Sequence, residues 1–127
     1  MPAYSPFLLF AVALGGALGS LLRYLVALSL LASFPLGTLT VNVAGCTLMG
    51  VLSTFFAHRW PEFQELRLFL TVGFLGGFTT FSSFALDIGQ LSEQGQYGAA
   101  FFYAFGSITL SLLGFFLAQI FMKMMLA

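Results

Sequence analysis

Gly73-Phe-Leu-Gly-Gly-Phe-Thr-Thr-Phe-Ser-Ser-Phe84 is a cluster of glycines and hydroxyl side chains inside an apolar stretch long enough to cross a bilayer. Glycine pairs and runs of Thr and Ser weaken a helix, and a loosened backbone is costly in hydrocarbon unless it meets an ion or a cavity. Interrupted helices at membrane depth are where transport proteins form ion sites. The stretch therefore predicts a membrane span that is broken near its middle.

The composition of the 127-residue chain indicates an integral membrane protein. Hydrophobic residues make up 60% and charged residues 6% of the sequence, and the mean hydropathy is +1.03. A soluble domain carries roughly 25% charged residues, so this chain has too few to cover a globule with polar surface. The net charge is zero and no basic patch is present, so no nucleic-acid partner is expected. The single cysteine, Cys46, is interpreted as a small packing residue.

Four segments are apolar over the roughly 20 residues that a helix needs to cross the hydrocarbon core. The predicted fold is all-α, one transmembrane domain over residues 1–127, with spans at about 6–31, 38–57, 66–88 and 97–126. The connections are too short for a soluble domain, so any activity is expected inside the membrane. We interpret the first segment as a retained span rather than a cleaved signal peptide, because no Lys or Arg precedes it.

Small residues recur at the four-residue spacing that lets membrane helices approach closely. Gly15 and Gly19 form such a pair in the first span, and Gly73 and Gly77 form another in the third. Four short helices enclose little volume, so a single copy is not expected to line a conduction path alone. Oligomerisation is therefore predicted.

Two polar side chains lie deep in the first two spans. Arg23 is the only full charge there, and it either binds an anion or caps carbonyls of a neighbouring helix. Its close-packing surroundings favour the structural role. Asn42 offers an amide with two donors and one acceptor group. It either forms an interhelical hydrogen bond, worth about 1 kcal/mol, or donates to an anion, and the sequence does not decide between the two.

Tyr103, Ser107 and Ser111 follow one another at four-residue steps in the fourth span. Each step turns about 400° around a helix, so the three hydroxyls form one gently drifting stripe. Such a stripe can hydrogen-bond a passing anion without the electrostatic trap that a Lys would set. The alternative is that each hydroxyl bonds the carbonyl four residues before it.

Phe81 and Phe84 follow the predicted break at a spacing that places both on one helix face. Aromatic ring edges are positive and can accept an anion, although two phenylalanines at this spacing are usually core residues. At the break itself, carbonyls between Gly76 and Thr79 can be left without intrahelical donors, and carbonyl oxygens suit a hard cation such as Na⁺. The alternative there is a kink hydrated by water.

An enzyme is not expected from this sequence. It contains no paired carboxylates, no HExxH, no GxSxG and no nucleotide-binding loop. Asp87 ends the third predicted span and is expected to be solvated near the membrane interface, and His58 is expected to be a surface residue of a loop.

Over its whole length the chain resembles the Fluc family of fluoride channels, also called CrcB proteins. The resemblance rests on Gly16-Ala-Leu-Gly-Ser-Leu-Leu-Arg-Tyr24, Gly37-Thr-Leu-Thr-Val-Asn-Val-Ala-Gly45, the 73–84 stretch and the hydroxyl stripe, in the family's order. It implies a fluoride-selective channel of the bacterial cytoplasmic (inner) membrane. Such a channel exports fluoride passively and protects the cell after HF has leaked in and dissociated.

The resemblance also implies an assembly and a set of site residues. Family members are antiparallel, dual-topology homodimers with two pores, so fluoride, membrane lipid and a second copy of the chain are the expected partners. A structural Na⁺ at the dimer centre is implied, held by the backbone carbonyls that match Gly76 and Thr79. The anion path is implied at the positions that match the family's pore residues: Asn42, Phe81, Phe84, Tyr103, Ser107 and Ser111.

Two features depart from the family pattern. Relatives usually carry Glu where this chain has Asp87, so the role of that position is open. Arg59, Arg67 and Lys123 fall on the side of the termini and weakly favour a cytoplasmic location for both ends, which fits dual topology imperfectly.

Two rival functions are open to a chain of this kind. One is a small four-helix multidrug or proton-coupled transporter, which needs a membrane-embedded carboxylate for proton exchange. The first span contains Arg23 but no Asp or Glu, which argues against that class. The other is a non-transporting assembly subunit, which would need neither a broken helix nor aligned hydroxyls.

Overall fold

The computed structural model describes residues 5–127, and every regular element among them is a helix. α1 spans Pro6–Ser29, α2 spans Leu36–His58 and α6 spans Tyr97–Leu126. Between α2 and α6 lies a segmented helix built from α3 (Gln64–Leu68), η1 (Phe69–Leu75), α4 (Gly76–Phe78) and α5 (Phe81–Glu93). Within the described residues, four helical runs are long and apolar enough to cross a membrane, which confirms the predicted all-α fold with four spans.

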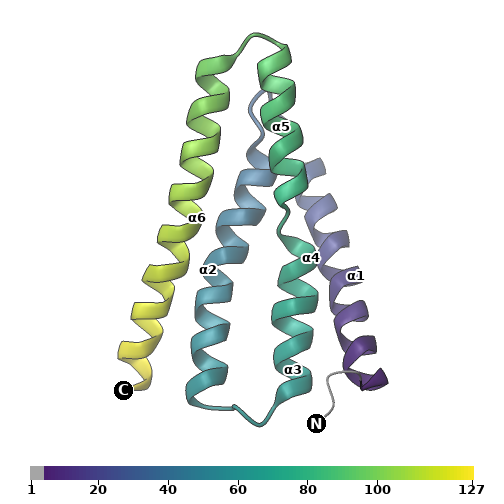
Figure 1. Ribbon diagram of the computed structural model, residues 1–127, viewed down its shortest axis with the longest axis vertical. Helices are drawn as coiled ribbons and strands as arrows, with labels where there is room; N and C mark the ends of the chain where they lie inside the picture. The colour runs from purple at the N-terminus through teal and green to yellow at the C-terminus, as the bar shows by residue number, and fades with distance from the viewer. Residues whose placement is uncertain (1–4) are drawn as a thin grey trace.

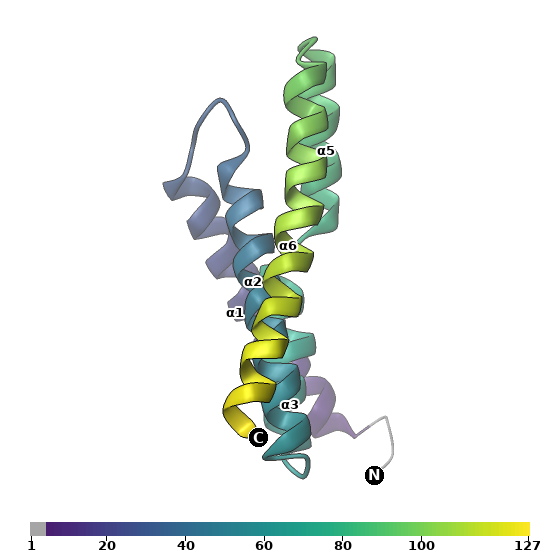
Figure 2. The ribbon, with the colours of Figure 1, turned by 90° about the vertical axis from the view of Figure 1, so that its left-hand side faces the viewer.

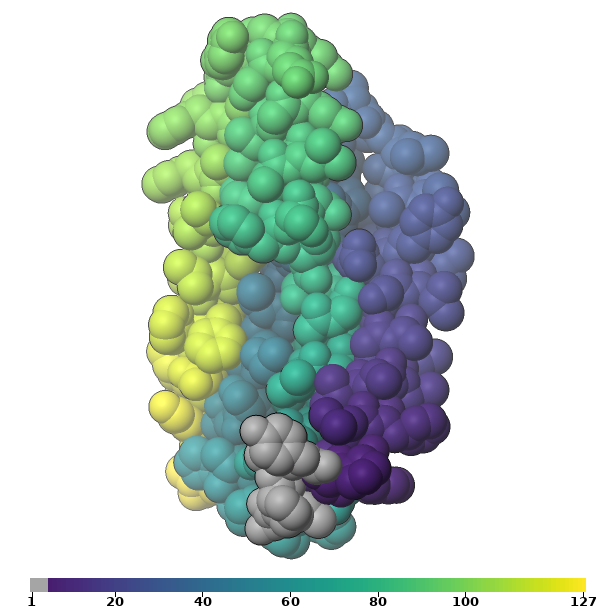
Figure 3. Space-filling view, turned by 45° about the vertical axis from the view of Figure 1, so that its right-hand side comes forward, coloured from purple at the N-terminus to yellow at the C-terminus, as the bar shows by residue number. Residues whose placement is uncertain are grey.

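The four runs alternate in direction (Figure 1). The start of α1, the α2–α3 connection and the end of α6 lie at one end of the molecule, and the α1–α2 and α5–α6 connections lie at the other. α5 and the adjoining part of α6 diverge from the α1–α2 hairpin (Figure 2) and project beyond it (Figure 3). The α5–α6 connection is therefore set apart from the α1–α2 connection.

The third helical run is longer than its apolar part. The predicted span covered residues 66–88, whereas the helical run extends from Gln64 to Glu93 and is followed by Gly95 in a left-handed conformation (φ 76°). Polar residues after Ile88 continue the helix because nothing in them breaks it before Gly95, and glycine is the residue that adopts a positive φ without strain. The limits of the apolar run and of the helix thus differ.

The break in this run lies between α4 and α5, as the sequence predicted (Figure 1). Thr79 and Thr80 are extended, with φ/ψ of −87°/156° and −153°/122°. The Thr80 hydroxyl then accepts a hydrogen bond from the Ser83 amide at 3.1 Å, which caps the first turn of α5. The hydroxyl residues of the 73–84 stretch therefore both end one helix and start the next.

A feature that the sequence did not reveal precedes the break. η1, Phe69–Leu75, is a π-helix, whose backbone hydrogen bonds reach one residue further than those of an α-helix. The Thr71 hydroxyl donates to the Arg67 carbonyl at 2.7 Å beside it. Segments of π-helix are rare and occur often at functional sites, and this one leads directly into the interrupted segment.

Glycine contacts hold α1 against η1 and α4. A Cβ added at Gly15 would lie 2.8 Å from the Phe74 amide nitrogen, and one at Gly19 would lie 2.9 Å from that of Phe78. From the other side, a Cβ at Gly77 would lie 2.6 Å from the carbonyl oxygen of Gly16. The small residues noted in the sequence thus allow backbone-to-backbone contact, which positions α1 beside the break.

Candidate functional site

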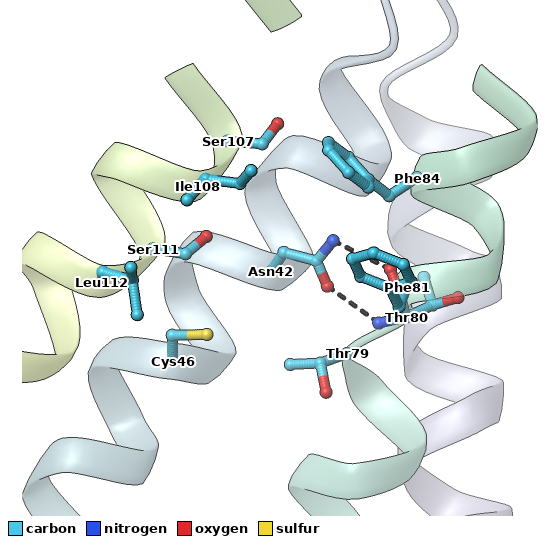
Figure 4. A pocket seen from close by; sticks show the side chains of 10 residues that line it. All are labelled: Asn42, Cys46, Thr79, Thr80, Phe81, Phe84, Ser107, Ile108, Ser111 and Leu112. Carbon is cyan, nitrogen blue, oxygen red and sulfur yellow. Dashed lines mark hydrogen bonds between the residues drawn. The ribbon is translucent and has the colours of Figure 1, made fainter. Parts of the chain in front are cut away.

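An open groove with a volume of about 310 Å³ lies between α2, the break and α6 (Figure 4). Each neighbouring element contributes residues to its wall: Asn42 and Cys46 from α2, Thr79 and Thr80 from the break, Phe81 and Phe84 from α5, and Ser107, Ile108, Ser111 and Leu112 from α6. None of these ten side chains is charged at neutral pH. The groove therefore offers hydroxyl, amide, thiol and ring-edge groups without a fixed ion.

Asn42 holds the extended segment in place. Its Nδ2 donates to the Thr80 carbonyl at 3.0 Å, and its Oδ1 accepts from the Thr80 amide at 2.8 Å (Figure 4). The interhelical hydrogen bond considered from the sequence is therefore present. An amide nitrogen carries two N–H groups, so one donor of Asn42 remains after this pairing. The two interpretations of Asn42 are thus compatible in one side chain.

Arg23 bonds the carbonyl next to the break from the opposite side. Its Nε donates to the Gly77 carbonyl at 2.9 Å, which is a cap of the kind considered from the sequence. The side chain borders a separate cavity of about 180 Å³, shared with Thr38, Thr80 and Ser83, and does not line the groove. The structure therefore gives Arg23 a contact that stabilises the backbone of α4.

The carbonyls of Gly76 and Thr79 have lost their usual helical donors. In an α-helix these carbonyls would accept from the amides four residues on, those of Thr80 and Ser83. The Thr80 amide donates instead to Asn42, and the Ser83 amide donates to the Thr80 hydroxyl. The two oxygens are therefore free of those bonds. Oxygen atoms of this kind fit a hard cation, although two are fewer than such an ion takes.

Phe81 and Phe84 both line the groove but differ in burial. Their ring centroids are 5.4 Å apart and the planes are tilted by 46°. The Phe84 side chain is buried, at 7% exposure, and its ring lies 5.3 Å from that of Tyr103, whereas Phe81 is 78% exposed. Phe84 is thus partly a core residue, while Phe81 presents its ring at the surface of the chain.

The three hydroxyls of the fourth span all face inward on α6. Tyr103, Ser107 and Ser111 are 1%, 5% and 9% exposed, in agreement with the predicted stripe. Ser107 and Ser111 line the groove, and the Ser107 Oγ is buried with no hydrogen-bond partner among the described residues. The alternative, a bond to the carbonyl four residues back, is therefore not used by Ser107.

Tyr103 is engaged differently from the two serines. Its hydroxyl donates to the Asp87 Oδ2 at 2.8 Å, and the side chain does not line the groove. Asp87 is half-buried, so the carboxylate expected near the membrane interface is also engaged by a neighbouring helix. Packing of Phe84 against Tyr103 brings α5 and α6 together at this level, one turn before Asp87. No sequence signal linked the two residues, since they are 16 positions apart.

Asp87 also borders a second cavity at the α5–α6 end of the molecule. This cavity has a volume of about 500 Å³ and is lined largely by polar side chains, among them Ser33, Gln90, Gln94 and Gln96. His58 lies at the opposite end, where its Nδ1 pairs with the Thr54 carbonyl at 2.9 Å. Its side chain is exposed, as expected, but it is the last residue of α2 and not part of a loop, because the helix continues one residue beyond the apolar span.

Comparison with known proteins identifies relatives over most of the chain. The family model described as CrcB-like protein, Camphor Resistance (CrcB), matches residues 10–119. A "Fluoride-specific ion channel FluC" of Paracoccus denitrificans is 55% identical over 104 residues, which cover 80% of this chain and 82% of that protein. A protein of the same name from Rhodospirillum centenum is 50% identical, over 86% of this chain and 90% of the relative. Another from Rhizobium meliloti is 47% identical, over 90% of this chain and 94% of the relative.

Proposed function

This chain belongs to the CrcB-like family, and from that premise we propose that it is a fluoride-specific channel whose anion path follows the groove between α2 and α6. Its relatives are named as ion channels, so the family is not enzymatic. With four apolar spans and bacterial relatives, it is a multi-pass protein of the inner membrane. The family membership also sets aside the rival proton-coupled transporter.

The observation that carries the proposed path is the uncharged groove that Ser107 and Ser111 line; Ser107 Oγ is one of two buried side-chain oxygens without a partner among the described residues, and the other, Thr54 Oγ1, does not line the groove. A buried polar group without a partner costs about 1–3 kcal/mol, so proteins rarely retain one without a ligand or water to satisfy it. Ser107 lines an uncharged groove, with Ser111 one turn further along α6, and its Oγ is buried beneath that wall. A small anion that is a strong hydrogen-bond acceptor is the ligand that best suits such donors.

Fluoride would cross by exchanging water for weak donors. The Ser107 and Ser111 hydroxyls and the remaining Asn42 N–H replace part of its hydration shell, and the edges of Phe81 and Phe84 contribute a weaker attraction. Conduction requires binding that is loose enough to release the ion. Because no cationic side chain lines the groove, the anion meets no deep electrostatic well there, and transport proceeds passively down the gradient.

We propose that Tyr103 acts beside this path and not in its wall. Its hydroxyl proton is held by Asp87, and both residues lie between the groove and the polar cavity at the α5–α6 end. Tyr103 therefore orients this end of the path, while the serines make the contacts with the ion.

The chain is further proposed to work as an antiparallel homodimer with a path on each side. Phe81 is 78% exposed and Gly76 is exposed beside it, so the groove and the break are open at the surface of one copy. A second copy would cover the groove. Two inverted copies would also bring together two pairs of Gly76 and Thr79 carbonyls, which makes four oxygens available to a structural Na⁺ at the centre.

Efflux from proteoliposomes tests the proposed function. The purified chain is reconstituted with internal fluoride or internal chloride, and release is followed with ion-selective electrodes. We expect the fluoride gradient to collapse while the chloride gradient persists, because the uncharged donors of the groove favour a strong hydrogen-bond acceptor over a weaker one. Equal release of both ions, or release of neither above that of protein-free liposomes, would overturn the proposal.

A further inference from the structure

The connection between α2 and α3 carries the only tryptophan of the chain, and nothing in the proposed fluoride path requires it. Trp60 is followed by Pro61, and the Phe63 amide donates to the Trp60 carbonyl at 3.2 Å, which closes a tight turn with proline at its second position. Proline is favoured there because its fixed φ matches the turn. The Trp60 side chain is therefore positioned by a short connection with little freedom.

Two phenylalanines hold the indole ring in place. The Trp60 ring centroid lies 5.0 Å from that of Phe55 and 5.3 Å from that of Phe63, with the planes at 76° and 64°. Such edge-to-face contacts are favourable beyond the area that they bury. Trp60 and Phe63 are nevertheless 45% and 46% exposed. The three rings, which we call the aromatic turn, thus present a fixed apolar surface that the rest of residues 5–127 leaves open.

The length of α2 places the aromatic turn at the boundary of the membrane. α2 has 23 residues, and at a rise of about 1.5 Å per residue it is about 35 Å long. The hydrocarbon core is about 30 Å thick, so a helix that crosses it ends at the level of the lipid headgroups. The turn follows directly at that end of the molecule (Figure 1). An indole ring, with an apolar body and one N–H donor, is suited to this level.

The charges beside Trp60 indicate which lipid group the turn recognises. Arg59 directly precedes Trp60 and is exposed, and a guanidinium group can donate two parallel hydrogen bonds to one phosphate. Residues 59–68 contain two arginines and two glutamates, so their charges cancel and do not favour anionic lipid in particular. We propose that the aromatic turn is a binding site for phospholipid headgroups, in which Arg59 binds the phosphate and Trp60 lies beside the glycerol ester groups.

Because the chain has a single tryptophan, fluorescence tests the position of the turn in unmodified protein. The chain is reconstituted into vesicles of phosphatidylcholine that carries bromine either near the headgroup or deep in the acyl chains. We expect emission at shorter wavelengths than that of tryptophan in water, weak quenching by aqueous iodide, and stronger quenching by the shallow bromines than by the deep ones. The same pattern is expected when part of the lipid is anionic phosphatidylglycerol, because the turn has no net charge.

A depth control and a charge series complete the test. Leu113 is 50% exposed and lies two residues beyond Ser111, on the face of α6 opposite the groove. Trp60→Phe combined with Leu113→Trp should therefore be quenched more by the deep bromines. The phosphate contact is tested by native mass spectrometry of protein with added phosphatidylcholine. Arg59→Gln should retain fewer phospholipid molecules than wild type, and Arg59→Lys should retain more than Arg59→Gln because it keeps the positive charge.

Several results would overturn the inference. They are emission like that of tryptophan in water with strong iodide quenching, quenching mainly by the deep bromines, or no quenching by any of the three, which would mean that another protein surface covers the turn. Equal phospholipid retention by wild type and Arg59→Gln would contradict the phosphate contact. None of these measurements uses fluoride flux, so the inference and the proposed function are tested separately.

Discussion

Tyr103 and Ser107 are neighbours on one helix face, yet their hydroxyls have different chemical roles. The Tyr103 hydroxyl donates to Asp87 Oδ2, with 2.8 Å between the two oxygens, whereas the Ser107 hydroxyl has no partner within the described chain. Elsewhere in the spans the Thr47 and Thr71 hydroxyls bond the carbonyl four residues before them, whereas Thr54 Oγ1, like Ser107 Oγ, is buried without a partner among the described residues. A stripe that looks uniform in sequence is therefore divided into Tyr103, which bonds Asp87, and the two serines, which line the groove.

The Asp87–Tyr103 hydrogen bond should make a measurable contribution to stability. A hydrogen bond to a charged acceptor contributes about 1.5–3 kcal/mol, and removing only one partner leaves the other unsatisfied. We expect Asp87→Asn and Tyr103→Phe to be non-additive, with a coupling of about 1–2 kcal/mol in a double-mutant cycle of unfolding free energies. The same cycle between Asp87→Asn and Tyr97→Phe, whose exposed ring lies at the start of α6, should give additive effects. Additivity in both cycles would show that the bond does not persist in the membrane.

At the scale of the element, the interrupted helix is stabilised by contacts from both sides. Asn42 pairs with both backbone groups of Thr80, and Arg23 bonds the Gly77 carbonyl. These side chains replace partners that a continuous helix would have supplied, and in hydrocarbon such replacement is necessary because water cannot take that place. The break is therefore a fixed part of the structure, held by α1 and α2.

The close approach of α1 to the break gives a prediction for glycine substitutions. Gly19→Ala would bring a Cβ within 2.9 Å of the Phe78 amide nitrogen, so the backbones must separate. We expect a loss of about 1–3 kcal/mol in unfolding free energy, as for other overpacked cores, together with reduced fluoride efflux. Gly89→Ala is the matched control, because a Cβ there has no neighbour within 4 Å and Ala favours a helix. A Gly19→Ala variant as stable as Gly89→Ala would contradict the contact.

How far the sequence predicted these elements depended on the kind of signal. Span number and the position of the break followed from apolar run length and from the glycine and hydroxyl cluster, because both act locally. The π-helix of η1 had no such signal, since Phe69–Leu75 is an ordinary apolar run. The Asp87–Tyr103 bond and the unpaired Ser107 hydroxyl were equally hidden, because they depend on how α5 packs against α6. The roles of the pore residues and of Na⁺ stay predictions.

At the scale of the whole molecule, one copy is incomplete in two respects. Large apolar side chains, including Phe81, Phe101 and Phe105, are more than 60% exposed, and the groove is open. Lipid tails can cover the outward apolar surface. They offer no polar partners for the open groove or for the carbonyls at the break, whereas a second copy of the chain can cover both. The proposed antiparallel dimer satisfies both requirements with one contact surface.

Sodium is expected to stabilise the proposed dimer. If the Gly76 and Thr79 carbonyls of two copies hold Na⁺, exchange into sodium-free buffer with N-methyl-D-glucamine should weaken the dimer and lower fluoride efflux, and returning Na⁺ should restore both. Dimer fraction can be followed by single-molecule subunit counting in liposomes. A dimer and an efflux rate that are insensitive to the exchange, with no sodium bound, would contradict the site.

The central claim is that an uncharged, unpaired hydroxyl in the groove contacts the ion. The measurement that tests it most directly is fluoride efflux from proteoliposomes for Ser107→Ala against Ser92→Ala, whose hydroxyl bonds its own helix at the Ile88 carbonyl. We expect Ser107→Ala to lower efflux roughly tenfold, which corresponds to about 1.4 kcal/mol, without lowering the unfolding temperature, because no intrachain hydrogen bond is lost. Ser92→Ala should conduct normally. Equal efflux in the two variants would contradict the account.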